Sequence, residues 1–177
     1  SAVLAAPAWS APGDAAAGKR KTLTCNACHG VSGFKAMPRL GGQSADYIVS
    51  ALEAYKAGKR SHATMRDVAG ALSRRDMADL GAYYASITRA AAEESAEPPA
   101  ASNACAACHG TKGDQPAADD VPIIAGQSAA YIELVLMEYR AGTRIHETMQ
   151  AQVKDLDDAA LAQLAAWFAA RPGLLVK

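Results

Sequence analysis

The sequence is short of aromatic residues, of net charge and of long apolar runs. Phe, Trp and Tyr make up 6% of the 177 residues, and the formal net charge is zero. A chain without excess positive charge gives no reason to expect nucleic-acid binding. Its uncharged stretches, such as residues 1–13 and 159–170, all fall short of the ~18 apolar residues that a membrane-spanning helix needs. The sequence therefore predicts neither a nucleic-acid partner nor a transmembrane segment.

The apolar residues are mostly alanine, although half of the chain is hydrophobic. Alanine favours helix but buries little surface, so the core needs another source of apolar bulk. A bound group that is itself large and apolar would supply it. The alanine-rich start, residues 1–11, is compatible with the remnant of an export signal and equally with a plain tail.

The charges are unevenly distributed along the chain. Residues 1–92 hold 12 Lys and Arg against 6 Asp and Glu, a formal charge of +6. Residues 93–177 hold 6 against 12, a formal charge of −6. Such a difference gives a molecule a dipole that orients it during encounters with charged partners. It suggests that the two parts serve different partners, with an acidic one docking on residues 1–92. Docking through uncharged surface on either part remains the alternative.

The chain is an internal duplication. Residues 25–30, CNACHG, recur as residues 105–110, CAACHG, and residues 42–48 recur as residues 126–132. The second copy has four extra residues, placed in the loop 114–120, where an insertion costs little. From residue 42 onward the offset of 84 persists, and it pairs Tyr55 with Tyr139, Gly58 with Gly142, Arg60 with Arg144, His62 with His146 and Met65 with Met149.

Each copy is predicted to be helical, and no period-two strand pattern is present. Apolar residues recur at helical spacing from 47 to 55 and from 131 to 139, and a glycine stop follows each run. Ser73 and Asp157 are equivalent N-cap candidates for the last helix of each copy. We expect an all-α protein with an N-terminal domain of residues 1–94, including a tail of residues 1–13, and a C-terminal domain of residues 95–177. A polar, proline-stiffened linker is expected at residues 90–104.

The repeated Cys-x-x-Cys-His motif is the attachment signature of c-type haem. On a helical turn, positions i, i+3 and i+4 share a face, so Cys25, Cys28 and His29 can present two sulfurs and an imidazole to one flat group. A zinc site would want a second close ligand pair, a thioredoxin-like pair would want a βαβ context, and a disulfide would not explain the histidine. Covalent haem is therefore predicted at both motifs, the second being Cys105, Cys108 and His109.

A second axial ligand must come from elsewhere in each copy. Methionine is the usual partner of histidine in electron-transfer haem c, and it raises the reduction potential. Of the five methionines, only Met65 and Met149 occupy equivalent positions, whereas Met77 and Met137 have the pattern of core residues and Met37 has no counterpart. The rival ligands are the equivalent His62 and His146, which otherwise read as surface residues.

The chain from about residue 14 resembles the dihaem cytochrome c4 family. The pattern is the haem motif followed by Pro38-x-Leu40-x-Gly42-Gln43, Tyr47, Tyr55-x-x-Gly58-x-Arg60 and Met65, present twice, with Ile124 in place of Leu40 in the second copy. The resemblance implies two class I cytochrome c domains, each wrapped around one covalent haem and related by a pseudo-two-fold axis. It also implies that the Pro38 and Pro122 carbonyls hold the Nδ1–H of the histidine ligands.

The resemblance further implies a periplasmic electron carrier of a respiratory chain, soluble or peripherally bound to a membrane, that exchanges electrons with oxidases, reductases or dehydrogenases. An electron-accepting subunit of an oxidoreductase complex, such as a sulfur-compound dehydrogenase, is the alternative. An enzyme such as a dihaem peroxidase is disfavoured, because its iron needs an open position. Arg60 and Arg144 are candidates to pair with haem propionates or else are solvated, and Gln43 and Gln127 are candidates for loop hydrogen bonds.

Overall fold

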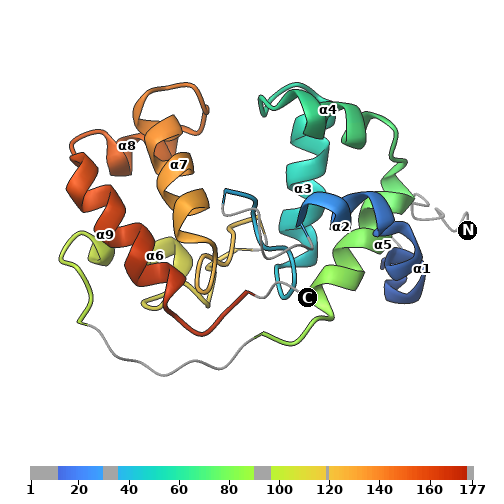
Figure 1. Cartoon of the computed structure of the whole chain (residues 1–177), viewed down its shortest axis with the longest axis horizontal. Helices are drawn as coiled ribbons and strands as arrows, with labels where there is room; N and C mark the ends of the chain where they lie inside the picture. Colours follow the sequence, from blue (N-terminus) through green and yellow to red (C-terminus); the bar gives the residue numbers. More distant parts are fainter. Residues whose placement is uncertain (1–11, 30–35, 90–96, 119, 175–177) are drawn as a thin grey trace, which may run out of the picture.

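The computed structural model describes residues 12–29, 36–89, 97–118 and 120–174. Within these residues the secondary structure is nine α-helices without a strand. The helices form two units, which we call the N-terminal unit (α1–α5) and the C-terminal unit (α6–α9) (Figure 1). Most of the predicted tail, the start of the predicted linker and the boundary at 94/95 lie outside the described residues.

The N-terminal unit consists of α1 (Ala15–Lys21), α2 (Leu23–His29), α3 (Ala45–Lys56), α4 (Ala63–Gly70) and α5 (Arg74–Ala85). Helix α5 is the centre of this unit, since both α1 and α3 pack against it, and α4 packs against α3. Helix α5 begins at the predicted cap Ser73, whose side chain forms a reciprocal capping box with Asp76.

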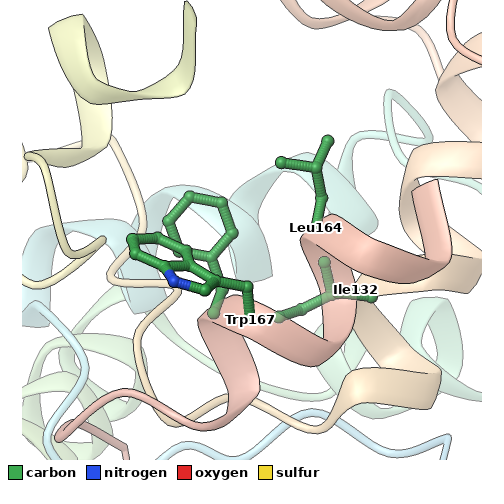
Figure 2. Close-up of a cluster of buried hydrophobic side chains, with 5 residues drawn as sticks. Ile132, Leu164 and Trp167 are labelled. Atoms are coloured by element: carbon green, nitrogen blue, oxygen red, sulfur yellow. The ribbon is translucent and has the colours of Figure 1, made fainter. Parts of the chain in front are cut away.

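The C-terminal unit consists of α6 (Ser102–His109), α7 (Ala129–Arg140), α8 (Glu147–Val153) and α9 (Asp158–Ala169). Helix α7 packs against α9 and α8, as α3 packs against α5 and α4. The predicted cap Asp157 accepts a hydrogen bond from the Ala160 amide. In this unit Ile132 of α7 meets Leu164, Trp167 and Phe168 of α9 in an apolar cluster (Figure 2).

Helix α1 has no helical counterpart in residues 97–101, which precede α6. It is held by the carboxylate of Asp79, which is 2% exposed and accepts from the Asp14 amide at 2.8 Å. Lys21 and Arg75 also pair with that carboxylate, at 2.7 and 2.9 Å. Gly18 allows α1 to approach α5 closely, because a Cβ at this position would lie 1.9 Å from the Asp79 carbonyl oxygen.

The two units meet through buried side chains that bond to the backbone of the opposite unit. The Gln43 carboxamide bonds to both the amide and the carbonyl of Ile123, and the Gln127 carboxamide bonds in the same way to Arg39. Gln43 and Gln127 are related by the offset of 84, and so are Arg39 and Ile123. The contact thus repeats under the two-fold relation of the units. The glutamines do form loop hydrogen bonds, as expected, but the loops belong to the other unit.

Around this contact, Arg39 donates from Nη1 to the Gly126 carbonyl at 2.6 Å. Arg89 bridges the units, donating to the carbonyls of Gly42 and Asp114.

No helix in the described part of the chain is both long and apolar enough to cross a membrane.

Candidate haem sites

Each Cys-x-x-Cys-His motif lies on a short helix that ends at its histidine. The Nδ1 atom of His29, at the end of α2, lies 3.0 Å from the Pro38 carbonyl oxygen. The Nδ1 atom of His109, at the end of α6, lies 2.8 Å from that of Pro122. A carbonyl can only accept, so Nδ1 carries the proton and Nε2 presents its lone pair. The two proline carbonyls therefore hold the histidines as the resemblance implied.

Burial keeps both histidines in the form that binds metal. It lowers the pKa of His29 and of His109, although the hydrogen bond to each proline carbonyl acts in the opposite direction. A lowered pKa favours the neutral imidazole, which is the ligating species.

The four cysteines form no disulfide. The first of each pair is half-buried and packs against the apolar cluster of its unit: Cys25 against the cluster of Ile48 and Leu80, and Cys105 against that of Ile132 and Leu164. Leu40 and Ile124 pack against the same two clusters. Burial raises the pKa of both thiols. Cys28 and Cys108 are exposed. Each motif thus presents one sulfur from the apolar interior and one from the surface, with Leu40 and its replacement Ile124 in equivalent places.

The equivalent methionines Met65 and Met149 each occupy the first turn of a short helix, α4 and α8. Both are partly buried, and Met149 packs against the cluster of Tyr139, Val153 and Leu161. They lie in the same half of the molecule as the histidine of their own motif. The assignment of these two methionines as iron ligands stays a prediction.

The rival histidines have a structural role that sequence reasoning missed. His62 and His146 are the N-caps of α4 and α8, and their Nδ1 atoms accept from the amides of Met65 and Met149 at 3.3 and 3.4 Å. Each ring also meets a tyrosine edge-on, Tyr55 or Tyr139. Histidine is not a preferred N-cap, so the residue type did not predict this role. The one sequence feature that pointed to these histidines is their equivalent position, three residues before each methionine.

The remaining three methionines differ in burial. Met77 is 1% exposed and belongs to the core, as predicted. Met137 is 41% exposed, so its prediction as a core residue is wrong. The inward face of α7 carries Ile132, Val135 and Leu136, and residue 137 is turned ~100° past the last of these. Met37 is partly buried.

Arg60 and Arg144 are not the solvated side chains that one alternative expected. The guanidinium of Arg60 lies 4.8 Å from the centre of the Tyr55 ring and donates to the Tyr131 hydroxyl of the other unit at 3.1 Å. Arg144 lies over the Tyr139 ring at 5.0 Å, and its side chain is 13% exposed. The Nε atom of Arg60 is buried and has no hydrogen-bond partner in the structure. A buried donor without an acceptor suits an anionic group in this place.

The two units match different descriptions of cytochrome c domains. Residues 15–88 match the family model "Cytochrome c", and residues 98–168 match "Cytochrome C oxidase, cbb3-type, subunit III". Cytochrome c4 of Pseudomonas aeruginosa is 32% identical, over 86% of this chain and 87% of its own length.

The chain belongs to the cytochrome c4 family.

The fold agrees with this membership. The crystal structure of reduced cytochrome c4 from Pseudomonas stutzeri superimposes with a TM-score of 0.76 at 26% identity, covering 90% of this chain and all of the other. A thiosulfate dehydrogenase electron acceptor from Thiomonas intermedia is 31% identical, over 97% of this chain and 89% of its own length. The protein is accordingly a dihaem electron-transfer cytochrome with two covalently bound haem c groups.

The residues present fit this cofactor. A covalent haem with charged propionates requires two sulfurs, a neutral imidazole, apolar surroundings and a donor for the propionates. One short helix supplies the sulfurs and the imidazole against an apolar cluster, and Arg60 supplies an unpartnered donor at the contact between the units.

Proposed function

We propose that this cytochrome carries electrons between redox proteins of a periplasmic respiratory chain and is not an enzyme. The observation that supports it is that the same candidate ligands recur at equivalent positions in both units. Cys25 and Cys28 would hold the first haem, with His29 and Met65 as axial ligands of its iron. Cys105, Cys108, His109 and Met149 would do the same in the second. We take residues 1–94 and 95–177 as the two domains.

The chain's own residues would set the properties of each haem. The proline carbonyl fixes the ring of the histidine and raises its donor strength. Met65 and Met149, as the second iron ligands, would raise the reduction potential and would leave no position for a substrate. Arg60, with its unpartnered Nε, and the equivalent Arg144 would pair with propionates near the contact between the units. The haems held by these residues would supply electron transfer that forms and breaks no bond.

Carbon monoxide tests the closed ligand set, because it binds reduced haem iron only where an axial position is open. We expect the absorption spectrum of the reduced wild-type protein to stay unchanged under carbon monoxide. Met65→Ala serves as the positive control and should bind it at one haem. A carbon monoxide complex of the wild-type protein would contradict the proposal and point to an enzyme with an open iron.

A second function, an electron-accepting subunit of an oxidoreductase complex, is favoured by exposed apolar side chains of the C-terminal unit. Leu134, Met137 and Ile145 are 43%, 41% and 71% exposed. Their equivalents in the N-terminal unit are polar and exposed: Ser50, Glu53 and Ser61. The similarity to a thiosulfate dehydrogenase electron acceptor points in the same direction.

The duplication supplies the substitutions that test this function. A variant carrying Leu134→Ser, Met137→Glu and Ile145→Ser gives the C-terminal unit the surface of its counterpart. If the protein is such a subunit, a thiosulfate dehydrogenase supplied with thiosulfate should reduce this variant more slowly than the wild type. Reduction by a small inorganic reductant is the control and should not change. Equal rates with the dehydrogenase would favour the free carrier.

The proposed docking of an acidic partner on residues 1–92 rests on fewer cations than the sequence suggested. Lys21 pairs with Asp76 and Asp79, and Arg60 lies at the contact between the units. Lys19, Arg20 and Lys59 are exposed cations that such a partner would meet, whereas Lys56 donates to the Leu72 carbonyl.

A further inference from the structure

The histidine of each unit is linked to a glutamine of the other unit through one peptide group. The Pro38 carbonyl that accepts from His29 Nδ1 belongs to the same peptide group as the Arg39 amide. That amide donates to Gln127 Oε1 at 2.7 Å. The chain of contacts therefore runs from the His29 ring through the peptide group of Pro38 and Arg39 to the side chain of Gln127, which lies 88 residues beyond Arg39 in the sequence.

The same chain of contacts exists in the opposite direction. The Pro122 carbonyl accepts from His109 Nδ1 at 2.8 Å, and the amide of the same peptide group, that of Ile123, donates to Gln43 Oε1 at 2.9 Å. Each glutamine Nε2 also donates to the carbonyl of the residue that it holds, at 3.0 Å in both cases.

Both glutamines are fixed in their own unit. Gln43 and Gln127 are 3% and 5% exposed. Each Oε1 accepts a second hydrogen bond from the next residue's amide, that of Ser44 or Ser128, just before α3 or α7. A buried carboxamide with its oxygen and nitrogen both bonded has one orientation, so it holds the opposite peptide group in place.

A peptide group whose N–H donates is more polarised, and its carbonyl becomes a stronger acceptor; linked hydrogen bonds strengthen one another by ~10–30%. A stronger acceptor at Nδ1–H makes the imidazole a better donor to iron. A better donor stabilises the oxidised iron and so lowers the reduction potential of that haem.

We propose that Gln43 and Gln127 are positioning residues that act across the contact between the units, each lowering the reduction potential of the haem bound in the opposite unit. The proposal rests on the proposed function, in which His29 and His109 are the proximal ligands. It means that the potential of neither haem is a property of its own unit alone.

The test replaces each glutamine in the haem-loaded protein and measures both reduction potentials by spectroelectrochemical titration. Gln127→Met keeps the side-chain length but removes the acceptor. We expect it to raise the potential of the N-terminal haem and to leave that of the C-terminal haem nearly unchanged. Gln43→Met should do the reverse. Met149→His, made in the background of each variant, shifts the reduction potential of the C-terminal haem. It therefore shows which of the two measured potentials belongs to which haem.

A conservative variant separates this effect from loosening of the contact. Gln127→Glu keeps an oxygen for the Arg39 amide in either protonation state, so it should not raise the N-terminal potential even if it weakens the contact. A rise of both potentials together, a rise in the haem of the glutamine's own unit, or no change in either methionine variant would overturn the proposal. Failure of the proposed function would be seen earlier, in a wild-type protein without two one-electron steps, and would overturn both.

Discussion

Replacing Asp79 by alanine is expected to release α1 and to destabilise the folded protein. The Asp79 carboxylate is 3% exposed as a side chain and accepts from the Asp14 amide in front of α1. It also pairs with Lys21 at the end of α1 and with Arg75 on its own helix. The variant removes all three contacts at once and leaves the Asp14 amide without that acceptor.

The magnitude follows from these contacts. A hydrogen bond to a charged group contributes ~1.5–3 kcal/mol net, and Asp79 makes two, to Asp14 and to Lys21. The pair with Arg75, which is 51% exposed, adds at most ~1 kcal/mol. Alanine also removes the cost of burying the carboxylate, which offsets part of the loss. We expect the free energy of unfolding to fall by about 3 kcal/mol at pH 7.

The loss should depend on pH. The hydrogen bond from Lys21 lowers the pKa of Asp79, and Lys21 with Ser73 lowers that of Asp76 to about 2. Because the folded pKa lies below the unfolded value of about 3.9, the stabilisation is complete above that value and is lost as the pH falls through the folded pKa. The difference between wild type and Asp79→Ala should therefore shrink below about pH 4.

Denaturant unfolding of the haem-loaded protein at several pH values, followed by circular dichroism, measures this difference. Asp158→Ala is the matched control, since Asp158 pairs with Arg140 but is 79% exposed; it should cost at most ~1 kcal/mol. A loss for Asp79→Ala no larger than for the control, or a loss that persists unchanged at pH 2.5, would refute the reasoning.

Three further predictions concern the haems and the charged surface. The mature protein should have the mass of two covalent haems and no titratable free thiol, because all four cysteines lie in haem motifs; a mass with one haem would contradict this. Met65→Ala and Met149→Ala should each lower the reduction potential of one haem and leave that of the other nearly unchanged. His62→Ala should keep the methionine-ligated spectrum and lose only about 1 kcal/mol of stability, because it removes the helix cap. A changed axial ligand in the histidine variant would reverse the assignment. The double variant Lys19→Glu with Arg20→Glu should slow electron exchange with an acidic redox protein. The wild-type rate should fall as the salt concentration rises, since screening acts over ~10 Å at 0.1 M. A rate that neither the substitutions nor the salt changes would contradict the docking hypothesis.

Local signals in the sequence were sufficient for much of the fold. Ser73 and Asp157 were recognisable as caps because a cap depends on three or four neighbouring residues. The haem motifs were recognisable because their spacing is itself the geometry of a helical turn. The duplication then located Met65 and Met149 by equivalence alone.

Features that depend on packing between distant segments were not predictable. A glutamine in a loop has no sequence mark that distinguishes a local bond from one to a residue 80 positions away, as Gln43 makes. The exposure of Met137 depends on which face of α7 the other helices cover. The hydrogen-bond partner of Arg60 is Tyr131, which belongs to the other unit.

The glutamine contacts bear on how the two copies of a duplicated gene can diverge. Each carboxamide bonds to backbone atoms, so the side chains of the residues that it holds do not enter the bond. Those residues are Arg39 and Ile123, a cation and an aliphatic residue, at equivalent positions. Mutation can therefore make one copy positively charged and the other negatively charged while the symmetric contact between the units is kept.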